Sequence, residues 1–193
     1  MRLAYVSTDP GIPVFGMKGG SIHIQEVIRA FIARGAEVTV ISPRLDEEAP
    51  YDLACVRQIP LPSLPKQNAE TRAKALLQLN ANVIAALEGL APLDMIYERH
   101  ALFAHGAMEL ALETDVPGVL EVNAPLMIEQ EQHRELSLSE HATLSTRRAM
   151  SAASQITAVS HQVQTYCVEQ GAQRSCVQVL PNGVNPKRCL LYT

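Results

Sequence analysis

The sequence lacks the surplus of basic residues that a generic binder of nucleic-acid phosphates needs. It contains 16 Lys and Arg against 20 Asp and Glu, a net charge of −4, so no nucleic-acid partner is expected. No apolar run approaches the ~18 residues of a membrane span. Residues 1–6 combine one Arg and a short apolar run without the small-residue cleavage site of a signal peptide. These absences predict a soluble, cytoplasmic protein without a transmembrane segment.

The sequence also lacks the cysteine spacing of a metal site. It has four cysteines, Cys55, Cys167, Cys176 and Cys189, with no C-x-x-C pair and no His at zinc-finger spacing from two of them. We therefore expect ordinary reduced thiols, because free Cys behaves as a small buried hydrophobe.

Short apolar runs alternate with amphipathic segments along the whole chain. In the first amphipathic segment, apolar residues recur at Ile24, Val27, Ile28 and Phe31, a helical stripe with the 3.6-residue period. Helices are predicted from Ser21 to Gly35 and at 68–90, 102–114, 126–153 and 161–170. Strands are predicted at 3–6, 37–42, 55–59, 94–98, 117–122, 155–159 and 176–180.

This alternation indicates right-handed βαβ crossovers and a parallel sheet with helices on both faces. The length of 193 residues suits one large domain. The predicted fold class is therefore α/β, a doubly wound, Rossmann-like parallel sheet.

Ligands of such sheets bind beyond the carboxyl ends of the strands. The Gly19–Gly20 pair before the first predicted helix is the most informative feature there, because glycines allow close approach and helical N–H groups attract anions. The segment has neither the G-x-G-x-x-G fingerprint nor a Walker loop, since Met17 and Lys18 follow Gly16. The alternative is a flexible loop with a glycine helix entry.

Two weaker candidates lie in the second half of the chain. Glu129 and His133 are four residues apart on a predicted helix, so metal binding is conceivable, but we expect a solvated helix face and no metal. Ser160 precedes His161, yet adjacent side chains point apart and no G-x-S-x-G elbow surrounds them, which argues against a hydrolase triad.

Several segments together resemble family 4 glycosyltransferases of GT-B fold. The opening GGSIHIQEVIRAF at 19–31 and RGAEVTVI at 34–41 are followed by IYERH at 96–100. LEVNAP at 120–125, AVS at 158–160 and LPNGVN at 180–185 come in the family's order. The resemblance covers residues 1–186, which we take as an N-terminal domain, with an atypical short tail at 187–193.

The resemblance implies two Rossmann-like domains that face each other across a cleft. The N-terminal one would hold the acceptor, and the C-terminal one would bind a nucleotide sugar, with retention of anomeric configuration and no metal cofactor. Gly19 and Gly20 would face the donor phosphates, and the acceptor side of the cleft would contain Glu98, Arg99, His100, Ser160 and Asn182.

The sequence departs from the family in two ways. Asn123 stands where many members have a His near the reacting sugar, so this position can hydrogen-bond a hydroxyl but cannot act as a base. The donor-binding domain and its paired glutamates (E-x7-E) are missing. Glu113, Glu121 and Glu129 match that spacing without the glycine-rich context, which we interpret as coincidence, and we attribute the odd tail to truncation, a frameshift or a fragment.

Two functions follow as hypotheses. The first is the N-terminal half of a retaining glycosyltransferase, inactive alone, that acts on a glycan, lipid or small-molecule acceptor and needs a donor-binding domain in cis or in trans. The second is a stand-alone binding module, or a subunit paired with a separate donor-binding chain.

Overall fold

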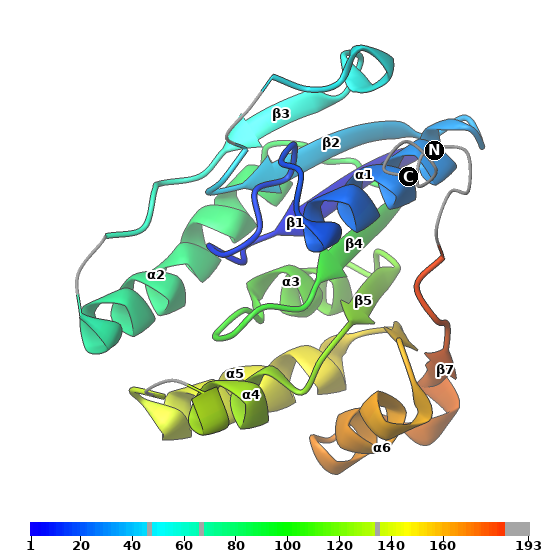
Figure 1. The fold of residues 1–193 in the computed structure, drawn as a ribbon. Helices are drawn as coiled ribbons and strands as arrows, with labels where there is room; N and C mark the ends of the chain where they lie inside the picture. Colours follow the sequence, from blue (N-terminus) through cyan, green and yellow to red (C-terminus); the bar gives the residue numbers. More distant parts are fainter. Residues whose placement is uncertain (46–47, 66–67, 134–135, 184–193) are drawn as a thin grey trace, which may run out of the picture.

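A computed structural model describes residues 1–45, 48–65, 68–133 and 136–183. Its centre is one seven-stranded sheet in which all neighbouring strands are parallel, in the order β3-β2-β1-β4-β5-β6-β7 (Figure 1). The strands are β1 (Arg2–Ser7), β2 (Glu37–Ser42), β3 (Arg57–Pro60), β4 (Met95–Arg99), β5 (Gly118–Val122), β6 (Gln155–Ala158) and β7 (Val177–Val179). The predicted doubly wound parallel sheet is confirmed.

Helices cover both faces of the sheet. They are α1 (Gly19–Ile32), α2 (Ala69–Glu88), α3 (Gly106–Glu113), α4 (Leu126–His133), α5 (Ser139–Ala152) and α6 (His161–Glu169), with short 3-10 turns η1 (Tyr51–Leu53) and η2 (Arg174–Cys176). Helix α1 packs in one core, whereas α2, α3, α5 and α6 share the core on the opposite face. The chain changes direction between β1 and β4, and ligands of open α/β sheets bind at such a switch point.

Side chains of one strand alternate between the two cores. Leu3 and Tyr5 of β1 lie on the α1 face, and Ala4 and Val6 lie on the other, as the two-residue period of a strand requires. On the α1 face the ring of Tyr5 stacks on Tyr97 with centroids 5.2 Å apart. This stack ties the two strands at the switch point together.

Two predicted helix starts are wrong. Helix α1 begins at Gly19 and not at Ser21, because extended Lys18 is the N-cap and its carbonyl accepts the first helical bond from Ile22 N–H at 2.9 Å. Helix α3 begins at Gly106 and not at residue 102. Phe103 has a left-handed φ of 68°, which a helix of L-residues does not tolerate.

A side chain from a distant helix also fixes the start of α3. Asn80 of α2 accepts hydrogen bonds from the backbone N–H groups of His105 and Gly106, both at 2.9 Å. Its amide donates to the carbonyl of Phe103 at 2.9 Å. The first free N–H groups of α3 are thus satisfied by α2, a tertiary cap that local sequence does not reveal.

The predicted helix over 126–153 is in fact two helices, α4 and α5. Leu138, directly before α5, has a φ of 55°, so one continuous right-handed helix is impossible there.

The predicted ends of α1 and α6 fit the structure better. Gly35 and Gly171 follow these helices with φ of 79° and 104°, conformations that glycine adopts without strain.

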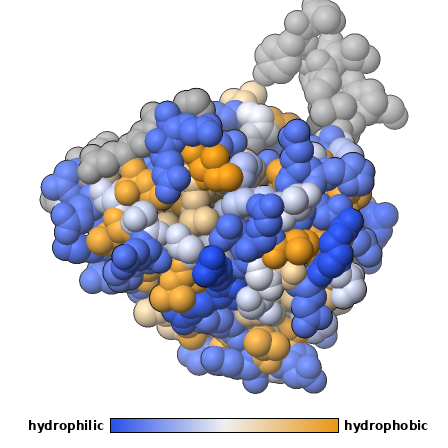
Figure 2. Space-filling model, turned by 90° about the horizontal axis from the view of Figure 1, so that it is seen from below, coloured by the Kyte–Doolittle hydropathy of each residue, from blue (hydrophilic) through white to orange (hydrophobic). Residues whose placement is uncertain are grey.

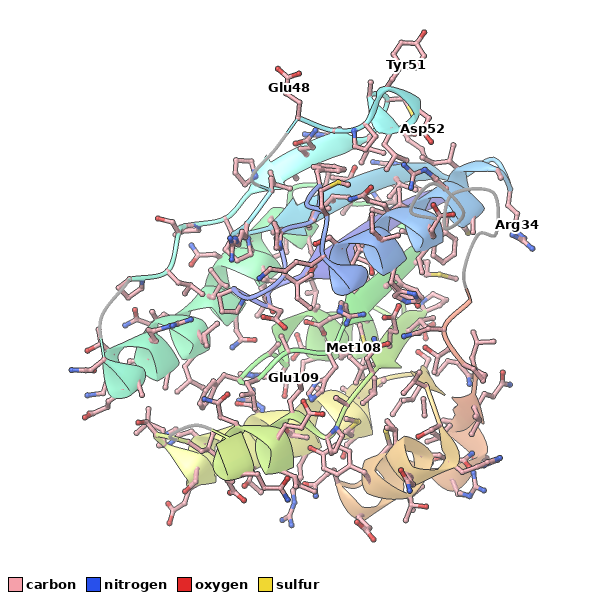
Figure 3. All side chains as sticks on the ribbon, viewed as in Figure 1. Arg34, Glu48, Tyr51, Asp52, Met108 and Glu109 are labelled. Carbon is pink, nitrogen blue, oxygen red and sulfur yellow. The ribbon has the colours of Figure 1, made fainter. Side chains whose placement is uncertain are left out.

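The surface mixes residue types. Seen from below, hydrophobic areas are broken up by hydrophilic residues (Figure 2). Tyr51, 98% exposed, extends outward at the far end of the β2–β3 connection (Figure 3). Within the described ranges, no helix combines the length and apolar character needed to cross a bilayer. The predicted tail at 187–193, with Cys189, lies outside the described residues.

Candidate functional site

Polar side chains gather on the α1 face at the carboxyl ends of β4 and β5. Arg99 and Glu121 are register partners on these neighbouring strands. The guanidinium of Arg99 donates to Glu121 Oε1 at 2.7 Å, and the hydroxyl of Tyr97 donates to Oε2 at 2.7 Å. His23 Nε2 of α1 lies 3.1 Å from Oε1. Glu121 therefore joins β4, β5 and α1.

The amide of Asn123, just beyond β5, also donates to Glu121 Oε1. We call Glu121 and its four partners, His23, Tyr97, Arg99 and Asn123, the Glu121 cluster. Beyond β7, the amide of Asn182 donates to Asn123 Oδ1 at 2.8 Å. The structure thus brings Asn123, Asn182 and Arg99 together, as expected for residues at the ends of adjacent parallel strands.

The surroundings of Glu121 keep it ionised. Burial alone raises its pKa, but the hydrogen bond and charge of His23, the hydrogen bond of Tyr97 and the charge of Arg99 outweigh burial and lower that pKa to about 2. A carboxylate that accepts several hydrogen bonds and faces a cation favours its charged form. Glu121 therefore carries a negative charge, to which Arg99 and Asn123 both donate hydrogen bonds.

The other two members of the predicted triplet lie on the opposite face of the sheet. Glu98 and His100 flank Arg99 and alternate with it, and they are 1% and 5% exposed. In the described residues, Glu98 Oε2 and both ring nitrogens of His100 are buried without a hydrogen-bond partner, as is Thr8 Oγ1. Burial raises the pKa of Glu98 to about 8 and lowers that of His100 to about 4, so both are neutral near pH 7.

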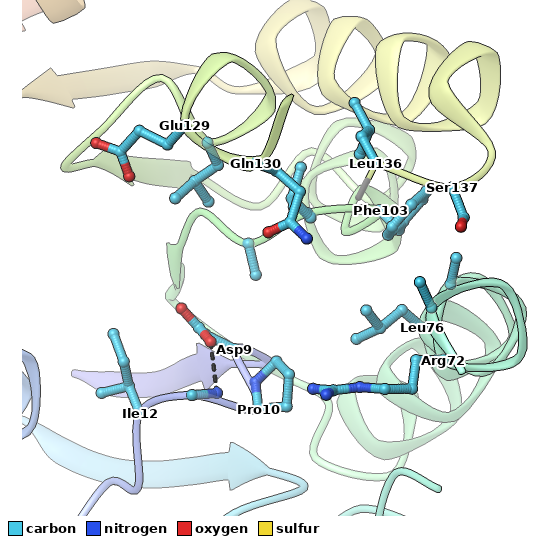
Figure 4. Close-up of a pocket in the computed structure, with 16 residues that line it drawn as sticks. Asp9, Pro10, Ile12, Arg72, Leu76, Phe103, Glu129, Gln130, Leu136 and Ser137 are labelled. Carbon is cyan, nitrogen blue, oxygen red and sulfur yellow. Dashed lines mark hydrogen bonds between the residues drawn. The ribbon is translucent and has the colours of Figure 1, made fainter. Parts of the chain in front are cut away.

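A pocket of about 560 Å³ opens on this second face (Figure 4). It lies between the loop after β1, the first turns of α2, the loop after β4, and α4. Among the described residues, Asp9, Arg72 and Glu129 are its charged lining, and Leu76, Phe103 and Leu136 belong to its apolar wall. Its volume is that of a typical small-molecule site. Thr8 and His100 directly precede lining residues Asp9 and Ala101.

The remaining predicted residues occupy helix starts. Gly19 and Gly20 form the first turn of α1, where helical N–H groups lack intrahelical partners, and a side chain at Gly20 would lie 2.9 Å from Ile12 Cδ1. Ser160 caps α6 by accepting a hydrogen bond from Val163 N–H at 3.3 Å. Ser160 is thus bound to its own helix, with His161 as the first helical residue.

The described residues form neither a metal-ion site nor a reactive cysteine. They contain no group of three or more His, Cys, Asp or Glu that could hold a metal ion, and the side chain of His133 lies outside the described part. Cys55, Cys167 and Cys176 are free, as predicted. Burial raises the pKa of the Cys167 thiol to about 12, so it is not a nucleophile at neutral pH.

Sequence reasoning missed Glu121, His23 and the pocket residues. In the sequence, Glu121 stands out only by its seven-residue spacing to Glu113 and Glu129. The usable signal was its position two residues before Asn123, on the same side of the strand. His23 and Arg72 gave no local signal, because their partners and neighbours are far away in sequence.

A sequence model described as Glycosyltransferase Family 4 matches residues 17–188. The chain belongs to this family. A search of curated protein sequences finds no match. The fold agrees with the half of a GT-B glycosyltransferase that forms its N-terminal domain.

Solved structures of glycosyltransferases show the same fold. Sucrose-phosphate synthase from Thermosynechococcus elongatus superposes with a TM-score of 0.67 at 14% identity, over 96% of this chain and 49% of that one. WaaG, a glycosyltransferase involved in lipopolysaccharide biosynthesis, gives 0.65 at 14% identity, over 96% and 46%. HepE from Anabaena, in complex with UDP, gives 0.52 at 16%, over 96% and 45%. The family 4 chain spans about half the length of these proteins.

Proposed function

We propose that this chain is the acceptor-side half of a retaining glycosyltransferase, which moves a sugar from a nucleotide-sugar donor to a glycan, lipid or small-molecule acceptor. The observation that carries the proposal is the family 4 match over residues 17–188 on a sheet whose carboxyl edge holds a 560 Å³ pocket. The likeness to HepE, which binds UDP, supports a nucleotide-sugar donor. In this proposal the nucleotide sugar is a co-substrate, and the transfer needs no resident metal or other cofactor.

Each part of the carboxyl edge has a role in this proposal. The first turn of α1, with Gly19 and Gly20, faces the donor phosphates, which helix N-termini favour. Asn123, held by Glu121 and Asn182, hydrogen-bonds a hydroxyl of the reacting sugar. Buried residues support the acceptor side from within. Glu98 and His100 do so by packing, Arg99 by its ion pair and Ser160 by capping α6.

The proposed transfer also needs a donor-binding domain, supplied in cis or in trans, and takes place in the cytoplasm. Transition-state stabilisation requires groups on both sides of the reacting bond. The chain alone is therefore expected to be inactive with UDP-, GDP- and ADP-sugars.

The test compares the chain alone with a hybrid that continues after Gly183 into the C-terminal domain of HepE. UDP binding by the hybrid, measured by calorimetry, first establishes that the donor half is folded. We then expect the hybrid, and not the chain, to release UDP from UDP-glucose with an acceptor panel of sugars, alkyl glycosides and their phosphorylated forms, and the product anomer is read by NMR. Asn123→Ala should lower that rate at least tenfold, while Arg34→Gln, an exposed change beyond the C-terminal end of α1, leaves it unchanged.

Three results would count against the proposal. Robust turnover by the 193-residue chain would overturn the need for a second domain. A hybrid that binds UDP but never turns over would overturn the transferase assignment. Micromolar binding of a nucleotide sugar by the chain alone, without turnover by the hybrid, would favour the stand-alone binding module.

A further inference from the structure

The walls of the pocket differ sharply in chemistry. Leu76 of α2, Phe103 of the loop after β4 and Leu136 before α5 lie together on one side (Figure 4). Asp9 and Glu129 lie on the other side of the opening. A ligand that fills the pocket therefore has one apolar portion and one portion that can donate hydrogen bonds to carboxylates.

Among the described lining residues, one cation faces into this space. Arg72, in the first turn of α2, extends its guanidinium into the pocket opening near Pro10 (Figure 4). In the described part of the chain its guanidinium has no hydrogen-bond or ion-pair partner, whereas Lys74 two residues on pairs with Glu70 at 2.6 Å. An arginine fork binds phosphate or carboxylate bidentately.

The backbone adds to this preference for an anion. Ala69, the first residue of the 20-residue helix α2, also lines the pocket. A helix N-terminus carries a partial positive charge that favours anions. The side chain of Asn68 caps Thr71 N–H at 2.9 Å, and the partial positive charge of this helix start adds to the charge of Arg72.

We propose that this pocket binds an amphipathic acceptor whose anionic group, a phosphate or a carboxylate, pairs with Arg72 and whose apolar portion packs on Leu76, Phe103 and Leu136. Hydroxyl groups of the acceptor face Asp9 and Glu129. This inference rests on the proposed function, because it names the acceptor class of that transferase. It is nevertheless testable on the chain alone by binding.

The experiment measures binding of three probes to the full chain by NMR titration. Octyl phosphate carries both groups, octyl glucoside has the same chain without the charge, and inorganic phosphate has the charge without the chain. Both octyl probes are kept below their micelle-forming concentrations. We expect octyl phosphate to bind at least tenfold more tightly than either other probe.

Matched variants then assign the contacts. Arg72→Gln should weaken octyl phosphate at least tenfold and leave octyl glucoside unchanged. Lys74→Gln removes the same charge from the same helix but does not line the pocket, so it should change neither affinity. Leu136→Asn should weaken both octyl probes without affecting inorganic phosphate. Thermal denaturation checks that each variant is folded.

The outcomes separate the possibilities. Equal binding of the two octyl probes, or equal effects of Arg72→Gln and Lys74→Gln, would overturn the anionic acceptor. Inorganic phosphate binding as tightly as octyl phosphate would indicate a site for free anions and would overturn the amphipathic assignment. Arg72-dependent binding of octyl phosphate combined with an inactive hybrid would keep this pocket assignment and overturn the transferase function.

Discussion

Two buried glutamates on neighbouring strands have pKa values that are shifted in opposite directions. Glu121 is 5% exposed and Glu98 is 1% exposed, yet the pKa of Glu121 lies at about 2 and that of Glu98 at about 8. Glu121 faces Arg99, His23, Tyr97 and Asn123, whereas Glu98 Oε2 has no partner in the described residues.

The comparison shows that burial does not decide the charge of a carboxyl group by itself. Desolvation raises the pKa of both groups, and only partners on the same face reverse its direction. Because the strand period is two, adjacent residues of one strand belong to different environments. Arg99 is held by Glu121, while its sequence neighbours Glu98 and His100 lie among apolar side chains on the other face.

The largest expected effect comes from removing the charge of Glu121. Glu121→Gln keeps the shape of the side chain but leaves Arg99, 11% exposed, without its counter-ion. Breaking a buried pair in this way costs about 3–5 kcal/mol. Urea denaturation should show this loss, and Glu113→Gln, an exposed control, should shift the free energy of unfolding by less than about 0.5 kcal/mol. A loss below about 1 kcal/mol for Glu121→Gln would contradict the cluster.

Glu98 predicts an effect of comparable size that depends on pH. Its folded-state pKa of about 8 lies above the ordinary value of 4.5, so the folded state binds the extra proton and stability falls as pH rises through this window. Glu98→Gln cannot ionise and should remove this slope. At pH 9 the variant should be more stable than the wild type by about 5 kcal/mol. Parallel stability curves for both proteins between pH 5 and pH 9 would refute this account.

His100 predicts the opposite slope on the acid side. Its pKa is lowered from 6.5 to about 4 by burial, so the unfolded state binds the extra proton and stability falls as pH drops through this window. The Glu98→Gln background isolates this term, since the slope of Glu98 is absent there. Adding His100→Gln should remove a loss of about 3 kcal/mol between pH 6.5 and pH 4. An unchanged acid slope in the double variant would assign the loss to other groups.

The smallest effect on stability is expected for a solvent-exposed ion pair. Arg148 of α5 donates two hydrogen bonds, of 2.5 and 2.6 Å, to Glu109 of α3, and Arg148 is 44% exposed. Exposed pairs contribute less than about 1 kcal/mol and are screened by salt. Arg148→Gln should therefore change the unfolding free energy by less than this amount, and less again at 1 M NaCl. A loss as large as that of Glu121→Gln would remove the contrast between buried and exposed pairs.

Much of the fold was predictable because its signals are local. The apolar runs predicted all seven strands, and the helical period of Ile24, Val27, Ile28 and Phe31 predicted α1. The break at Leu138 and the late start of α3 were not predictable, because a left-handed backbone and a cap from Asn80, at least 25 residues away, produce them. The α/β class follows from the sequence, whereas these boundaries follow from packing.

The site was predictable only in outline. The rule that ligands bind beyond the carboxyl ends of parallel strands selected Asn123, Arg99 and Asn182. The structure joins these residues through Glu121. It also grouped Glu98 and His100 with Arg99, and the sheet separates them. The pocket residue Arg72 gave no signal, because a lone arginine in a helix is ordinary until the fold places it beside the loops after β1 and β4.

The sequence by itself determined the order of strands and helices, the parallel sheet and the family, because hydrophobic periodicity and short motifs are local features of the sequence. Tertiary structure alone decided which carboxylate is charged and which residues surround the pocket. The physical reason is that a pKa and a cavity depend on neighbours in space, and strand register and crossovers bring those neighbours together from distant parts of the chain.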